Sequence, residues 1–169
     1  GAAVPTHLGF VQQPTDVASG AAIAPAVTVQ LLDASEAAVA QAGVTVTVAL
    51  SSGTGALSGT ATQTTDAAGL ATFADLSVDL VGTKQLTASS APLVDAVSAS
   101  FVVSAGPPAA VTTTAGSPQV SLVNTAFAQP LAATVTDAAG NLVGGASVTF
   151  TAPASGASGL FSGSGASVT

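Results

Sequence analysis

An internal repeat constrains this chain more than any other feature of its sequence. When Asp33 is laid on Asp137, a shift of 104 residues (the difference between 137 and 33), the two stretches stay in register without a gap. The matched positions are Val39 and Val143, Ala42 and Ala146, Val44-Thr45 and Val148-Thr149, Val46 and Phe150, Thr47 and Thr151, Leu57 and Phe161, and Ser58-Gly59 and Ser162-Gly163. Apolar positions fall on apolar positions, so we interpret the chain as two copies of one structural unit of about 100 residues.

The boundary between the copies is expected near residues 104–108, Ser-Ala-Gly-Pro-Pro. A strand-like run ends there in small residues, and two consecutive prolines favour a short, stiff, extended connector. We therefore expect one domain over residues 1–105 and the N-terminal portion of a second over residues 106–169.

Alternation of apolar and polar residues marks the strands of the first copy. One predicted face carries Val27, Val29 and Leu31, and another carries Val44, Val46 and Val48. Further strands are predicted at 8–13, 57–65, 70–77 with Ala71 and Phe73 inward, 85–90 with Leu86 and Ala88 inward, and 96–104 with Val97, Ala99, Phe101 and Val103 on one face. About seven short strands indicate an immunoglobulin-like sandwich.

Composition and turn chemistry agree with an all-β chain. Hydrophobic residues make up 48% of the sequence and charged residues only 5%, so the side chains that usually cover exposed helix faces are scarce. The segments Asp66-Ala-Ala-Gly69 and Asp137-Ala-Ala-Gly140 place Asp at the start of a tight turn and Gly where a positive φ is needed. The predicted fold is a pair of tandem sandwiches, the first complete.

Several segments resemble known bacterial immunoglobulin-like repeats. In the first copy they are Leu8-Gly-Phe-Val-Gln-Gln-Pro14, Pro25-Ala-Val-Thr-Val29, Asp33 and Gly69-Leu-Ala-Thr-Phe-Ala-Asp-Leu76. In the second copy, Ala126-Phe-Ala-Gln-Pro-Leu131, Val135-Thr-Asp-Ala-Ala-Gly-Asn141, Val143 and Val148-Thr-Phe-Thr-Ala-Pro153 are similar to the invasin and intimin type. Leu142 occupies a position after the Gly-Asn turn where Pro is usual in these repeats. The first copy has Glu36-Ala37 in place of Gly-Asn.

This resemblance implies a fold and a location, and it implies no shared catalytic residues. Repeats of that kind act mostly as stalks that hold an adhesive tip away from the cell. The second copy has no counterpart of residues 66–104, because Thr169 aligns with Thr65. Either the sequence is a segment of a longer protein, or strands from a neighbouring molecule complete the second sandwich.

Charge and cysteine content exclude several classes of function. The net charge is −7, with eight acidic residues against the single Lys84, so no basic surface is expected to bind nucleic acid or anionic membranes. No apolar run is long enough for a transmembrane helix. There is no cysteine for a disulfide, a thiolate metal site or a nucleophile. No signal sequence is recognisable, so we expect either that one is removed before Gly1 or that the sequence is a fragment, and we expect an extracellular or cell-surface location.

Few side chains are suited to catalysis. His7 is the single histidine, and we expect it to be a surface or linker residue at the start of the first strand rather than the base of a triad. Asp75 and Asp79 could form a glycosidase-like pair, but the chain has no Trp or Tyr to stack on a sugar. We expect these carboxylates to cap turns, and we expect no enzyme activity.

The residues allow three other kinds of site. Asp33, Ser35 and Glu36 form the densest group of oxygen ligands, followed by Asp137 and Asn141, and turn hydrogen bonding is favoured over calcium for both. Lys84 could form an isopeptide bond with an Asp, helped by Glu36, although a solvated lysine is the default expectation. Thr112-Thr113-Thr114 and residues 155–167 could carry O-linked sugar. No catalytic, cofactor or metal site is expected.

The sequence thus predicts a structural or adhesive stalk whose partners are adjacent repeats or other copies of itself, with no ligand identified. The alternative is the subunit of an extracellular filament in which a neighbouring chain completes the second sandwich by strand complementation. A third reading is an accessory module attached to an enzyme.

Overall fold

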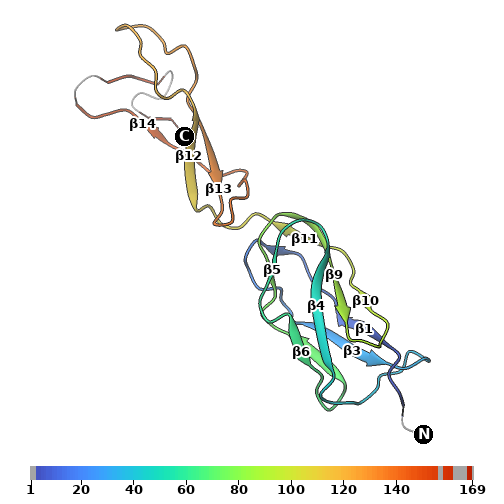
Figure 1. Cartoon of the computed structure of the whole chain (residues 1–169). Coiled ribbons are helices and arrows are strands. Elements are labelled where there is room, and N and C mark those ends of the chain that lie inside the picture. Colours follow the sequence, from blue (N-terminus) through green and yellow to red (C-terminus); the bar gives the residue numbers. More distant parts are fainter. Residues whose placement is uncertain (1–2, 156–157, 162–166, 169) are drawn as a thin grey trace. The chain divides into compact units, whose positions relative to one another are not determined.

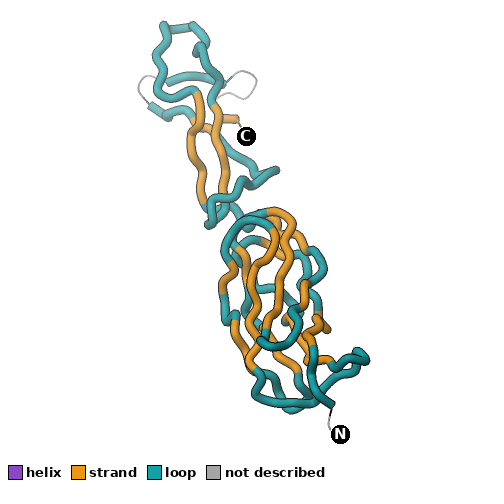
Figure 2. Tube along the Cα trace, turned by 45° about the vertical axis from the view of Figure 1, so that its right-hand side comes forward, coloured by secondary structure: helices purple, strands orange, loops and turns teal. Residues whose placement is uncertain are grey.

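The computed structural model describes residues 3–155, 158–161 and 167–168. Within them the chain is all-β, and it divides into two compact units, Gly1–Gly106 and Pro107–Thr169, here called the first and second units. Figure 2 shows strands joined by loops, with no helix in the described part of the chain. None of it forms a helix able to cross a membrane.

The first unit is a sandwich of two main sheets (Figure 1). The smaller sheet has the order β1-β3-β7, formed by His7–Gln12, Val27–Leu32 and Leu70–Phe73. The larger sheet has the order β2-β11-β9-β4-β6, with β10 also paired to β9; these strands are Val17–Ala18, Phe101–Ser104, Gly82–Ser89, Thr45–Ser52, Thr62–Thr64 and Ala96–Val97. A short pair joins β5 (Leu57–Ser58) to β8 (Ser77–Val78).

The core lies between these sheets and is built from alternate residues of each strand. Val27, Val29 and Leu31 of β3 are fully buried. From the facing sheet, the buried side chains are Val46, Val48, Leu86, Ala88, Phe101 and Val103. The predicted inward positions of β3, β4, β7 and β9 are confirmed, and so is the immunoglobulin-like sandwich.

The N-terminal segment contributes to both sheets. It pairs with β3 as β1, and it then crosses over and pairs with β11 in parallel as β2, with Val17 opposite Val103. The crossing is fixed by side chains: Gln13 Oε1 accepts the Ala99 N–H at 2.9 Å, and Asp16 Oδ1 accepts the Val102 N–H at 2.7 Å. A two-residue strand leaves no alternation to detect, and β2 was not predicted.

The predicted strand 96–104 is wrong in its middle. It is two strands, β10 and β11, and the Ser98 hydroxyl takes a place in the ladder by accepting the Leu86 N–H at 2.9 Å. The interruption shifts the alternation by one residue. Val97 and Ala99 are therefore exposed, whereas Ser98, Phe101 and Val103 are buried.

Two other predicted strands are also divided. Residues 57–65 form β5 and β6, and residues 70–77 include β7 and the start of β8. Thr60 lies in the first break and Asp75 in the second, and the Asp75 carboxylate accepts the Thr60 N–H at 2.9 Å and the Thr60 hydroxyl at 2.7 Å. The bond ties the two interruptions together.

The described residues of the second unit form two small sheets. Strands β12 (Ala110–Ala115) and β13 (Ala132–Thr136) form one, and β14 (Phe150–Thr151) pairs with β15 (Ser167–Val168) in the other. The sequence match at Ser162-Gly163 and the position of Thr169 lie outside the described residues.

The Asp-initiated turns have the expected geometry. In the turn at Asp66, Oδ1 accepts the N–H groups of Ala68 and Leu70, and Gly69 has a φ of 79°. In the turn at Asp137, Oδ1 accepts the N–H groups of Ala139 and Asn141, and Gly140 has a φ of 86°. Gly69 has a second constraint, because a Cβ there would lie 1.9 Å from the Val39 carbonyl oxygen.

This close approach separates two glycines of similar φ. We expect Gly69→Ala to destabilise the first unit by about 1–3 kcal/mol more than Gly20→Ala, because a clash with backbone is added to left-handed strain of about 1–2 kcal/mol. Gly20 is the matched control, since its φ is 75° and nothing lies within 4 Å of its added Cβ. Urea unfolding of both variants measures the difference, and equal losses would contradict the clash.

Candidate functional site

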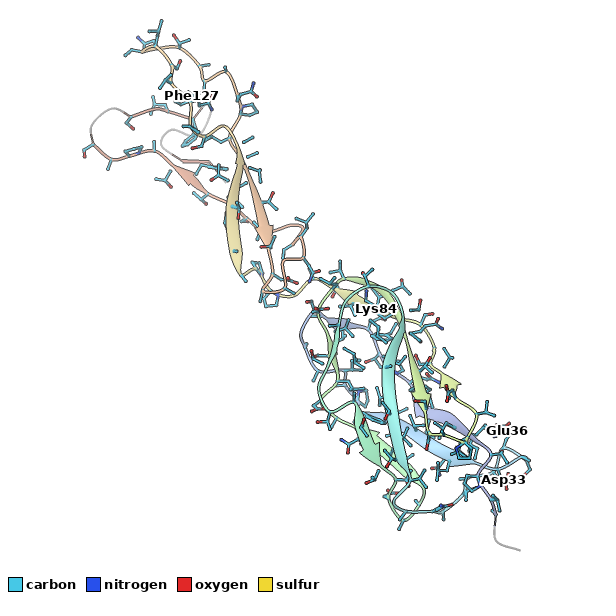
Figure 3. The ribbon with its side chains drawn as sticks, in the orientation of Figure 1. Asp33, Glu36, Lys84 and Phe127 are labelled. Carbon is cyan, nitrogen blue, oxygen red and sulfur yellow. The ribbon has the colours of Figure 1, made fainter. Side chains whose placement is uncertain are left out.

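Asp33 and Glu36 lie together at one end of the first unit (Figure 3), in the turn that follows β3. Asp33 Oδ1 accepts the N–H groups of Ser35 at 2.8 Å and Ala37 at 3.1 Å, and the Ser35 hydroxyl at 2.7 Å. The Ser35 hydroxyl, followed by these amides, lowers the pKa of Asp33 below its ordinary value. The carboxylate therefore serves as an acceptor that closes the turn.

His7 pairs with the same turn. Its Nε2 lies 3.1 Å from Glu36 Oε2, and its Nδ1 lies 3.0 Å from the Thr6 hydroxyl. The carboxylate is exposed and the imidazole partly so. Glu36 has a φ of 66°, which places a non-glycine residue where Gly140 stands in the second unit. The contacts link β1 to the turn after β3, with the geometry of a surface ion pair.

Asp75 and Asp79, the two acids that could form a glycosidase-like pair, bind different backbone amides. Asp75 accepts the Thr60 N–H, and Asp79 Oδ1 accepts the Ala56 N–H at 2.7 Å. The Thr60 hydroxyl, followed by the Thr60 N–H, lowers the pKa of Asp75. Each carboxylate therefore anchors the segment around β5, in the turn-capping role expected from the sequence.

Lys84 differs from its expected place in solvent. It is only 1% exposed, in phase with buried Leu86 and Ala88 along β9, and its Nζ donates to the Val81 carbonyl at 3.1 Å. Gly53 makes room for it, since a Cβ there would lie 2.6 Å from Lys84 Cδ. Figure 3 places Lys84 and Glu36 at opposite ends of the first unit, so Glu36 is not positioned to assist an isopeptide bond at this lysine.

In the second unit, Asp137 and Asn141 bind each other. Both are buried, and Asn141 Nδ2 donates to Asp137 Oδ2 at 2.9 Å while Oδ1 accepts the turn amides. In the described part of the chain, no three His, Cys, Asp or Glu residues are placed so that they could hold a metal ion. Thr112–Thr114 lie exposed on β12, and residues 156–157 and 162–166 of the Ser/Gly-rich stretch lie outside the described residues.

Comparison with known proteins shows the fold. No family model and no curated protein matches the chain. Among solved structures it is similar to FdeC, an adhesin of Escherichia coli, with 19% identity over 90% of this chain and a TM-score of 0.50. It is also similar to domains 5–6 of the S-layer protein SbsC, with 18% identity over 91% of this chain and 74% of that one, at a TM-score of 0.42. The chain spans 46% of the FdeC structure.

The burial of Lys84 can be tested with two substitutions. We expect Lys84→Ala to destabilise the first unit by about 2–4 kcal/mol, because it empties the space that the lysine methylenes fill. Lys84→Met keeps most of that volume, and we expect it to cost under about 1.5 kcal/mol. Chemical unfolding of both variants compares them, and an alanine variant as stable as the wild type would contradict a packing role.

The two lowered pKa values predict an acid dependence. A carboxylate whose pKa is lower in the folded state contributes stability above its ordinary pKa of 3.8, and this stability is lost as the pH falls through the folded value. We expect the urea midpoint to fall between about pH 5 and pH 2, and to fall less steeply in the Asp33→Asn, Asp75→Asn double variant. Thr60→Val, which removes one hydroxyl donor, should have an intermediate slope. An unchanged slope in the double variant would exclude these groups.

Proposed function

We propose that this chain is a non-catalytic structural or adhesive segment of a bacterial cell-surface or secreted protein, in which tandem immunoglobulin-like units act as a stalk or spacer. The observation that carries the proposal is a shared hydrogen-bond frame in the two units. The Val39 N–H donates to the Leu31 carbonyl at 2.9 Å, and the Val143 N–H donates to the Val135 carbonyl at 2.9 Å, a shift of 104 residues in both partners.

Other bonds repeat at the same spacing. The Asp33 N–H donates to the Ala37 carbonyl at 2.9 Å, and the Asp137 N–H donates to the Asn141 carbonyl at 2.9 Å. The Ala21 N–H donates to the Ala18 carbonyl, as the Thr125 N–H does to the Leu122 carbonyl, both at 3.0 Å. Repetition of one sandwich frame along a chain supports a role in spanning distance.

The polar side chains support a structural role. The described Asp33, Asp75 and Asp79 carboxylates hold backbone amides, and the single lysine packs inside the sandwich. The fold that the chain shares with an adhesin supports a surface location, although the identity of 19% by itself shows only the fold. Labelling of intact, unpermeabilised cells of the source bacterium with antibody against the first unit tests that location, and labelling only after permeabilisation would overturn it.

Resistance to proteolysis offers a second test of the stalk role. Lys84 is the single Lys or Arg of the chain and is buried, so trypsin has one site and that site is closed in the fold. We expect the native chain to survive trypsin and to be cut after Lys84 in urea. Thr54→Lys, in the exposed loop that follows β4, is the control and should be cut without urea. Rapid cleavage of the native wild type would contradict a stable stalk.

A filament subunit is the second candidate. Large apolar side chains are exposed in the second unit, among them Val120, Leu122, Val123 and Phe127. Apolar surface of this kind favours association with another chain. Light scattering at several concentrations, combined with electron microscopy, tests it: fibres or discrete oligomers support the filament, and a monomer at every concentration excludes it.

A further inference from the structure

The chain enters and leaves the first unit at opposite ends. His7, at the start of β1, lies 3.1 Å from Glu36, whereas Val103, near the end of β11, pairs with Gly82, two residues before Lys84. Figure 3 places Glu36 and Lys84 at opposite ends of the unit. Tension on the chain therefore draws the entering segment and the leaving segment in opposite directions along the same axis.

These two segments contact each other in parallel, and we call the contact between residues 6–19 and residues 94–104 the terminal seam. It begins with a parallel bridge between His7 and Val94. It ends in the parallel pairing of β2 with β11. The seam thus joins the entering segment to the leaving segment directly, whereas every other connection between them passes through β3, β9 and the core between the two sheets.

Two side chains bridge the middle of the terminal seam. Pro14 has no N–H to donate there, and the interruption between β10 and β11 lies opposite. Gln13 Oε1 accepts the Ala99 N–H at 2.9 Å. Asp16 Oδ1 accepts the Val102 N–H at 2.7 Å. Each bond joins residues 86 positions apart, the separation that also relates the paired residues of β2 and β11, so the side chains continue the register of that strand pair.

The direction of a pull decides how such a seam breaks. When two parallel segments are pulled from opposite ends, all the hydrogen bonds between them are strained together. When they are pulled apart at the same end, the bonds break one after another. Forced unfolding is governed by the unfolding rate, and interactions that are lost before the transition state set that rate. Bonds of the terminal seam therefore contribute more to the lifetime of the fold under tension than bonds elsewhere in the first unit.

We propose that the terminal seam is a shear clamp that makes the first unit resist tension, and that Gln13 and Asp16 make this clamp continuous. The proposal rests on the stalk function and deepens it, since it names the residues that oppose a pull along the stalk. Without these two side chains the seam would consist of two short contacts that can break separately. The bond to the Asp16 carboxylate is the stronger of the two, because hydrogen bonds to a carboxylate are charge-assisted.

Optical tweezers on the full 169-residue chain test the clamp in two pulling directions. The chain has no cysteine, so two introduced cysteines provide unique handles. Val4→Cys with Pro108→Cys, both at exposed positions, pulls along the terminal seam, and Ala21→Cys with Pro108→Cys pulls it apart from one end. At equal force we expect the folded first unit to survive at least about tenfold longer in the first direction, since several hydrogen bonds must break together. Equal lifetimes in the two directions would overturn the clamp.

Substitutions in the seam identify the residues that carry the clamp. Asp16→Ala removes the acceptor of the Val102 N–H, and we expect it to shorten the lifetime in the first pulling direction by about tenfold. Gln13→Ala should shorten it by about threefold, because its hydrogen bond is between neutral groups. Asp16→Asn keeps the Oδ1 acceptor and should preserve most of the lifetime. An Asp16→Ala chain that survives as long as the wild type contradicts the assignment.

Asp66→Ala is the matched control. The Asp66 carboxylate also accepts backbone amides of the first unit through one oxygen, but it lies in the turn before β7 and outside the terminal seam. We expect this variant to lower the urea midpoint while its lifetime under tension stays within about twofold of the wild type. If Asp66→Ala shortens that lifetime as much as Asp16→Ala does, the effect is a general loss of stability and the proposal fails. The stalk function is decided separately by cell labelling, which does not depend on how the purified chain responds to force.

Discussion

The burial of one face of β3 against the facing sheet is the interaction on which the first unit depends. Val27, Val29 and Leu31 are fully buried, and β1 and β7 pair with β3 on either side. Small side chains of this kind fill a sandwich only if the facing sheet is close, so Val46, Val48 and Leu86 must be supplied from β4 and β9. The N-terminal segment then joins the sheets by pairing first with β3 and later with β11.

One local device sets where the strands turn. Asp33, Asp66 and Asp137 each accept two backbone N–H groups, two and four residues further on, through one carboxylate oxygen. The sequence indicates this device where Asp is followed three positions later by Gly, as at Asp66 and Asp137, because glycine favours a positive φ. Gly69 and Gly140 satisfy it without strain, and Glu36 shows that the turn can impose this φ on another residue.

Alternation in the sequence predicted the inner faces of β3, β7 and β9, because these strands run without interruption. It gave the wrong face for Val97 and Ala99, because the Ser98 hydroxyl accepts the Leu86 N–H in place of a backbone carbonyl and the alternation of buried and exposed residues shifts by one. The prediction that Lys84 lies in solvent is wrong although the alternation of β9 is intact. Its position is in phase with buried Leu86 and Ala88, but a charged side chain is expected at the surface. The spacing of residues does not predict that the Val81 carbonyl accepts a hydrogen bond from Lys84, or that Gly53 leaves space for the side chain.

The second unit shows which part of the sandwich is encoded locally. In its described residues, the register of β12 with β13, the shift in that ladder and the Asp-initiated turn match those of the first unit, and no counterparts of β7 and β9 lie among these residues. The burial of side chains differs between the two units, because Phe127 and Leu131 are partly exposed whereas their counterparts Ile23 and Val27 are buried. Pairing and turn geometry thus arise from neighbouring segments, whereas the core requires a β7-type strand and the sheet beyond it.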